Sequence, residues 1–324
     1  SDNPVCMPAR ATIMTGMHAY NHGLLGNSND ERPMTQFPTL PGLLTAGGYQ
    51  TRAQGKMHFH PLRTNYGFEH MEILPDYYRT MAGHPERGVP MDHGIGQNEM
   101  DPVISTVSDT NSLTHWTVDR SIDFLETRDE SRPFFLWTSF AKPHPPFDPV
   151  KNYWDLYDGI TLPDPVYGNW SQEAADVPAG YMQPTWVLNN VHRFSKERLM
   201  ATRRAYYACI SQIDYNLGLL FARMRELDLL QNTWIIFTAD HGEMLGDHHM
   251  GAKSTFFEGS AHVPCIVKPP ASDFTTDRDR GVICRDLVCL ADILPTCLDV
   301  ARIKAPPFSQ IDGINLLDGD FDAD

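Results

Sequence analysis

The sequence predicts an α/β fold with a mostly parallel central sheet and helices on both of its faces. Short apolar runs alternate along the chain with segments that have helical periodicity. Parallel strands need long crossover connections, which are usually helices, so this alternation is typical of a parallel sheet. We therefore expect residues 1–324 to form a single α/β domain.

The first three predicted elements lie within the first 55 residues. The stretch "PARATIMTG" predicts a short helix, because Pro8 suits the first turn of a helix and Gly16 suits its end. A second helix should end at Gly47 and Gly48. A strand over residues 49–55 should follow it.

The middle of the chain predicts one helix, one strand and two loops. Residues 112–128 should form a helix that is capped by Ser112, and the apolar run 132–140 should form a strand. The proline-rich residues 141–149 should form a rigid loop. Residues 157–184 are rich in Pro, Gly and Asp, so we interpret them as an insertion or a surface loop.

A long helix should begin near Ser195, because apolar residues recur there mainly at spacings of three and four. These residues are Leu199, Tyr206, Ile210, Ile213, Leu217, Leu220, Met224 and Leu227. Residues 233–238 and 262–270 read as two further strands. A last helix over 285–301 should be interrupted by Pro295.

Composition excludes some classes of function. The formal net charge of −15 argues against a general nucleic-acid-binding protein, which needs a basic surface, whereas it fits cation binding. No apolar run is long enough to span a membrane. The sequence leaves the cellular compartment open between periplasmic, secreted and cytoplasmic.

The cysteines show neither CxxC pairs nor zinc-type spacing. We expect the five beyond Cys6 to be small buried hydrophobic residues, with a disulfide among the last three as the alternative. These five are Cys209, Cys265, Cys284, Cys289 and Cys297.

Polar residues follow three of the predicted strands. The pairs are Lys56 and His58, Lys142 and His144, and Asp240 and His241. Ligands of open α/β sheets bind beyond the carboxyl ends of the strands, so these pairs should converge at one edge of the sheet. Cys6, at the start of the first helix, is the candidate nucleophile for such a site.

Four segments resemble, in family order, the motifs of the type I sulfatases of the alkaline phosphatase superfamily. They are "CMPAR" at 6–10, "GKMHF" at 55–59, "KPHPPF" at 142–147 and "ADHGEMLGDHHMGAKSTFFEG" at 239–259. The resemblance implies a sulfuric ester hydrolase. It also implies an Asp-Asp pair on a first strand upstream of the cysteine and a smaller C-terminal subdomain, neither of which we find in this sequence.

The resemblance assigns the reacting group and its anion-binding residues. Cys6 would be oxidised by a formylglycine-generating maturation enzyme, and the hydrated gem-diol would be the nucleophile. Arg10 would hold this diol, while Lys56 and Lys253 would bind the oxygens of the sulfate. Two lysines and an arginine would offset the negative charge of a sulfate ester as its alcohol leaves. A solvated surface lysine is the alternative for Lys253.

The resemblance also assigns the proton-transfer and metal-binding residues. His58 would assist the diol, and His144 would lie near the leaving oxygen. Asp240, His241 and the converted Cys6 would hold a divalent metal. Ca²⁺ is the first choice, with Mn²⁺ and Mg²⁺ as alternatives.

The chemistry of a gem-diol explains why a cysteine precursor should stand at this position. A serine would form a sulfate ester that water must then attack. The second hydroxyl of a gem-diol can instead be deprotonated, which expels sulfate and restores the aldehyde. An unmodified Cys6 could alternatively be a thiolate nucleophile or an inert thiol.

Three functions remain open. The leading hypothesis is hydrolysis of sulfate monoesters of a small molecule or a saccharide. Because His241 stands where Asn is common in sulfatases, a phosphonate monoester or phosphodiester hydrolase is the second. The third is an inactive relative that binds sulfated ligands. We interpret His248 and His249 as loop or substrate-side residues, and leave the roles of His18 and His22 open.

Overall fold

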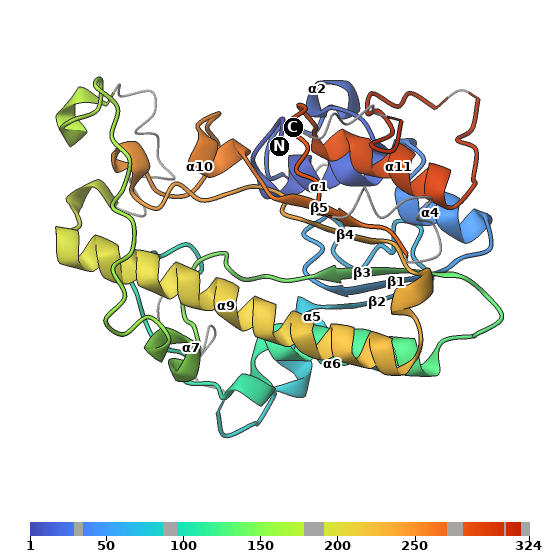
Figure 1. The fold of residues 1–324 in the computed structure, drawn as a ribbon, viewed down its shortest axis with the longest axis horizontal. Coiled ribbons are helices and arrows are strands. Elements are labelled where there is room, and N and C mark those ends of the chain that lie inside the picture. Colours follow the sequence, from blue (N-terminus) through green and yellow to red (C-terminus); the bar gives the residue numbers. More distant parts are fainter. Residues whose placement is uncertain (29–34, 87–95, 178–190, 271–280, 308, 319–324) are drawn as a thin grey trace.

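The core of the computed structural model is a parallel sheet of three strands in the order β2-β1-β3 (Figure 1). The structure describes residues 1–28, 35–86, 96–177, 191–270, 281–307 and 309–318. Strand β1 (Gln50–Gly55) lies between β2 (His70–Ile73) and β3 (Phe134–Ser139). Its last residue, Gly55, pairs with Ile73 and Ser139, so the three strands end level at one edge.

The parallel sheet confirms the predicted fold class, with one correction. Strands β4 (Ile235–Thr238) and β5 (Cys265–Lys268) pair with each other and are antiparallel. Among the described residues they form a second sheet rather than an extension of the first. Strand β2 and the helix α5 (Leu74–Thr80) after it were not predicted.

Helices cover both faces of strand β3. Its successive side chains point to opposite faces of the sheet, and apolar side chains on each face pack against a different set of helices. Phe135 and Trp137 pack against α1 (Cys6–Thr15), α4 (Leu40–Ala46) and α11 (Ile293–Val300). Phe134 and Leu136 pack against α6 (Leu113–Thr127) and α9 (Lys196–Glu226). Figure 1 shows these two helical layers on opposite sides of the strands.

The ends of the helices follow the predicted signals. Gly16 has the left-handed conformation, with φ of 67°, that ends α1. The Ser112 hydroxyl accepts a hydrogen bond from the His115 backbone N–H and so caps α6. Ser195 caps α9 in the same way. Of the eight apolar residues that predicted this long helix, Ile210 is exposed rather than buried.

The structure corrects one prediction about the second half of the chain and describes only part of the segment that another concerns. Pro295 does not interrupt a helix: the turn Leu290–Asp292 precedes α11, and Pro295 lies in the first turn of α11, where a missing N–H costs nothing. Residues 157–177 are irregular apart from the short turn Ala174–Asp176, and 178–184 lie outside the described residues.

The other α-helices whose bounds fall within the described residues are short. They are α2 (Ala19–His22), α7 (Lys151–Asp155) and α10 (Glu258–Ala261). In the part of the chain that the structure describes, no helix combines the length and the apolar character that crossing a membrane requires.

The five cysteines beyond Cys6 are less buried than expected. Cys209 is buried in α9, but Cys265 and Cys284 are exposed, and the other two are half-buried. All six cysteines are free, which contradicts the alternative of a disulfide among the last three.

Gly55 lies next to the polar strand ends, and the surrounding chain leaves no room for a side chain there. Its φ is +95°, and a Cβ there would lie 2.1 Å from the Ser139 carbonyl oxygen. Gly48 has a similar φ of +91° but open space around it. We expect Gly55→Ala to lower the free energy of unfolding by about 1–3 kcal/mol more than Gly48→Ala, because only Gly55→Ala adds a steric overlap. Urea unfolding of the two variants checks this, and equal losses would contradict it.

Candidate active site

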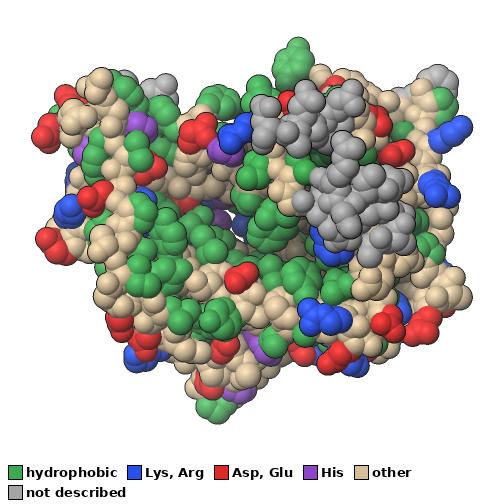
Figure 2. Space-filling model, in the orientation of Figure 1, with side chains coloured by type: hydrophobic (Ala, Val, Ile, Leu, Met, Phe, Trp, Pro, Cys, Tyr) green, Lys and Arg blue, Asp and Glu red, His purple; other side chains and the backbone are tan. Residues whose placement is uncertain are grey.

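Cys6 is the first residue of α1 and is completely buried. Its Sγ lies 3.1 Å from His241 Nε2 and 3.8 Å from Lys56 Nζ. Figure 2 shows a hollow near the centre of one face, with histidine and basic side chains deep within it. The thiol therefore lies at the start of a buried helix, next to groups from two different strand ends.

The surroundings of Cys6 favour a negative charge. Burial alone would raise the pKa of the Cys6 thiol. Hydrogen bonds with His144, His241 and His58, together with the charge of Lys56, instead hold that pKa well below its ordinary value. An anionic group at this position is therefore stabilised by the protein.

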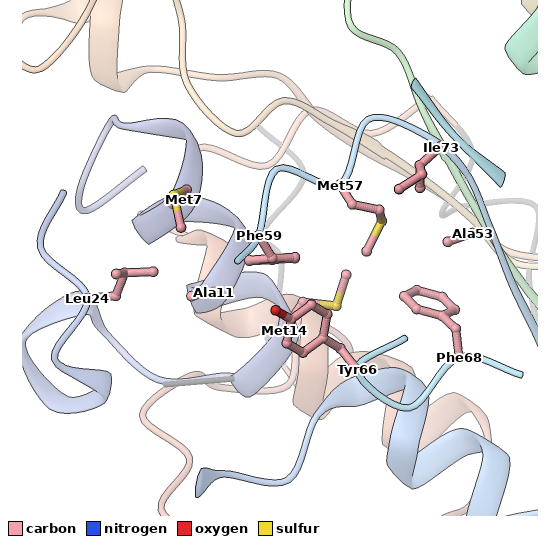
Figure 3. Close-up of a cluster of buried hydrophobic side chains, with 10 residues drawn as sticks. All are labelled: Met7, Ala11, Met14, Leu24, Ala53, Met57, Phe59, Tyr66, Phe68 and Ile73. Atoms are coloured by element: carbon pink, nitrogen blue, oxygen red, sulfur yellow. The ribbon is translucent and has the colours of Figure 1, made fainter. Parts of the chain in front are cut away.

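Lys56 and His58 are positioned by the residues between and after them. Met57 and Phe59 point into a hydrophobic core together with Met7, Ala11 and Met14 of α1 and residues near β2 (Figure 3). Because Met57 and Phe59 anchor the segment in this core, Lys56 and His58 are directed towards Cys6. Burial lowers the pKa of Lys56. His58 Nδ1 is buried and has no hydrogen-bond partner within the described residues.

Arg10 connects α1 to three strand ends. Its Nε donates to Asp240 Oδ2 at 2.8 Å, and its Nη1 donates to the Lys56 carbonyl at 2.8 Å and to Ser139 Oγ at 3.0 Å. Burial opposes the charge of Asp240, but the Arg10 guanidinium holds the pKa of that carboxyl far below its usual range. Asp240 is therefore a half-buried carboxylate with a fixed orientation.

Asp240, His241 and Cys6 fit a divalent cation. Their ligand atoms lie within 4.8 Å of one another. His241 Nδ1 donates to the Gly242 carbonyl at 2.8 Å, which directs Nε2 towards Cys6. Without its proton, this nitrogen would offer a lone pair to a metal, an arrangement typical of histidines that bind metals. A carboxylate oxygen and an imidazole nitrogen are ligands for Mn²⁺, while oxygen ligands suit Ca²⁺ and Mg²⁺.

His144 and Lys253 form the other side of the site. His144 follows β3, and its Nδ1 donates to the Pro145 carbonyl at 2.7 Å. Lys253 Nζ donates to His144 Nε2 at 3.2 Å. Burial, assisted by the charges of Lys56 and Lys253, lowers the pKa of His144 to about 4. The imidazole is therefore neutral near pH 7.

The structure thus brings together all eight predicted site residues, and it adds two that the sequence analysis missed. Ser139, the last residue of β3, holds Arg10. Asn27 Oδ1 accepts a hydrogen bond from the Met7 N–H in the first turn of α1. The position of Ser139 at a strand end was a usable signal, whereas no pattern in the sequence indicated Asn27.

Four further histidines that the sequence analysis considered make other contacts. His18 forms a half-exposed ion pair with Asp2, and His22 is buried against Thr12. His248 and His249 contact residues 166–171 rather than Cys6.

A family model described as Sulfatase matches residues 1–303. The chain belongs to the sulfatase family. Membership confirms the resemblance that the four motifs indicated and the predicted class of enzyme, a sulfuric ester hydrolase.

Characterised relatives of the family differ in the substrates that their names give. This sulfatase is 32% identical to an arylsulfatase of Clostridium perfringens, over 97% of this chain and 68% of that protein. It is 30% identical to a choline-sulfatase of Rhizobium meliloti, over 83% of this chain and 54% of that protein. The crystal structure of a phosphonate monoester hydrolase of Agrobacterium radiobacter superposes with a TM-score of 0.78 at 26% identity, covering 98% of this chain and 68% of that one.

The Arg10 connections lead to a prediction about stability. Arg10→Lys keeps the charge, but an ammonium group cannot reach Asp240, Ser139 and the Lys56 carbonyl together. We expect it to lower the free energy of unfolding by about 2–4 kcal/mol, since buried partners are left unpaired. Ser139→Ala removes one partner only and should cost about 1 kcal/mol. Urea unfolding at pH 7 measures both, and losses of similar size would show that the three-way connection contributes little.

Proposed function

We propose that this sulfatase hydrolyses sulfate monoesters, of a small molecule or a saccharide, at the site around Cys6. The observation that carries the proposal is the burial of Cys6 at a helix start, within reach of Lys56, His241, His58 and His144. Such surroundings suit a nucleophile that must receive a sulfuryl group and then release it.

Two groups would complete the site. Formylglycine, made from Cys6, would supply a hydrated aldehyde with two hydroxyls, one to accept the sulfuryl group and one to expel sulfate. A divalent cation would be held by Asp240, His241 and the converted Cys6, and it would supply positive charge next to the nucleophile. We propose Ca²⁺, with Mn²⁺ and Mg²⁺ as alternatives that metal analysis separates.

The other roles in the proposed reaction fall to side chains of the protein. Lys56 and Lys253 would bind the sulfuryl oxygens from two sides, because Lys56 approaches Cys6 directly and Lys253 approaches it through His144. His58 would take a proton from the nucleophile. The neutral His144, with Lys253 beside its Nε2, would lie at the leaving oxygen. Arg10 would keep Asp240 charged and fixed.

A second candidate function is hydrolysis of phosphonate monoesters or phosphodiesters by the same nucleophile. The superposition with the phosphonate monoester hydrolase and the histidine at position 241 both favour it. A panel of aryl sulfates, choline sulfate, aryl phosphonates and phosphodiesters, assayed with the full-length protein, separates the two functions. Failure to turn over any of them, with Cys6 unconverted and no metal bound, would favour an inactive relative that binds sulfated ligands.

We expect Cys6 to be converted to formylglycine in a host with the maturation machinery. Mass spectrometry of the tryptic peptide that ends at Arg10 should show a lighter peptide, because one oxygen replaces the sulfur and two hydrogens. Activity should track the converted fraction, and Cys6→Ala should be folded but inactive. Turnover of sulfate esters by a protein whose Cys6 is entirely unmodified would falsify the formylglycine mechanism in favour of a thiolate.

We also expect Asp240 to be required for binding of the metal. Asp240→Asn keeps the shape of the side chain but removes its charge, so the metal content of the purified full-length protein should fall at least about tenfold. Glu258→Gln is the matched control, because Glu258 is an exposed carboxylate in α10, paired with His262. Elemental analysis of both variants measures this, and an equal metal content in the two would rule out the assignment.

A further inference from the structure

Lys253 is carried by a loop whose backbone is under strain. Leu245, His248, His249, Ala252 and Ser254 all have positive φ, between 48° and 76°. Non-glycine residues rarely adopt this conformation, and it persists only where the surrounding structure holds it. The position of Lys253 therefore depends on the contacts that hold residues 245–257 in this conformation.

Residues 166–171, from the segment that the composition indicated to be a surface loop, bind this loop along its outer side. The backbone N–H of His248 donates to the Val166 carbonyl at 2.8 Å, and the backbone N–H of Val166 donates to Asp247 Oδ1 at 3.0 Å. The Ser171 hydroxyl lies 2.9 Å from His248 Nδ1. His249 Nε2 donates to the Ser171 carbonyl at 3.1 Å.

Trp170 connects the two ends of the Lys253 loop. Its indole stacks on His248, with ring centroids 4.8 Å apart, and on Phe257, with centroids 5.5 Å apart. His248 lies five residues before Lys253, and Phe257 lies four residues after it. His248 and Phe257 also contact each other, with centroids 4.8 Å apart, so the indole packs on the pair of rings that closes the segment carrying the lysine.

The inner side of the loop is fixed by the site itself. The Met244 N–H donates to the Ala252 carbonyl at 2.8 Å, and the Ser254 N–H donates to the Pro4 carbonyl at 3.1 Å, two residues before Cys6. If residues 166–171 no longer held the outer side of the loop, the resulting displacement would therefore reach Lys253 and, through Ser254, the chain at Pro4 beside the nucleophile.

We propose that residues 166–171 are a clamp that positions Lys253, with Trp170 as its central positioning residue. The proposal rests on the proposed role of Lys253 in binding the sulfuryl oxygens. It gives the irregular segment 157–177 a function in catalysis, although none of residues 166–171 contacts Cys6 in the described hydrogen bonds.

The first test does not depend on activity. Hydrogen–deuterium exchange of the full-length protein should show peptides covering 247–257 exchanging at least about tenfold faster in Trp170→Ala than in wild type. Trp116→Ala is the matched control, because Trp116 packs on Tyr77 in a described cluster that contains no residue of 245–257. Ser171→Ala keeps every ring and should produce a smaller increase. Unchanged exchange in Trp170→Ala, or the same change in Trp116→Ala, overturns the clamp.

The second test is a double-mutant cycle with Lys253. Trp170→Ala should lower kcat/KM by about 10- to 100-fold, and Trp170→Phe, which keeps a stacking ring, should restore most of it. In a Lys253→Ala background, Trp170→Ala should have little further effect, because there is no lysine left to position. Fully additive losses overturn the positioning role. If the wild type hydrolyses no ester, the proposed function fails, while the exchange experiment still decides the clamp.

Discussion

The buried contact between Arg10 and Asp240 is the interaction on which the rest of the site depends. Through its three hydrogen bonds, the guanidinium fixes the first helix against the ends of β1, β3 and β4. The antiparallel pair β4-β5 is separate from the main sheet in the described residues, so no ladder of backbone hydrogen bonds sets the position of Asp240 relative to β1. The side-chain contact between Arg10 and Asp240 sets this position instead. Because it is buried and charged at both ends, it tolerates little displacement.

Positive side chains outnumber negative ones around this contact, and this excess indicates that the site binds an anion. Arg10 is a buried cation and Lys56 a half-buried one, whereas Asp240 is the half-buried carboxylate that Arg10 binds. Burial lowers the pKa of Lys56 and keeps His144 neutral, which limits the excess of positive charge. A bound anion would reduce that excess further, since charges interact strongly where water is excluded. A protein with a net charge of −15 thus keeps a local site for an anionic group.

The sequence predicted which polar residues lie close together better than it predicted the sheets. Lys56, Asp240 and His241 lie within three residues of a strand end, and His144 lies in the loop after β3. The geometry of α/β sheets brings strand ends together whatever their exact pairing. Pairing itself depends on contacts between distant residues, so neither the four-residue β2 nor the antiparallel direction of β5 could be inferred from local patterns. The exposure of Cys265 and Cys284 escaped prediction for the same reason: burial is a property of the packed chain rather than of the residue type.

Lys56 and Lys253 show two ways of placing a cation in one site. Lys56 directly follows β1, and its neighbours Met57 and Phe59 lie in the hydrophobic core, so its position is as rigid as the sheet. Lys253 lies on a loop with strained backbone that is held by side chains from a distant segment. A loop can be repositioned by changes in residues 166–171, whereas a strand end cannot move without disturbing the core. The lysine on the loop is therefore the one whose position can change without disturbing the sheet or the contacts of Arg10.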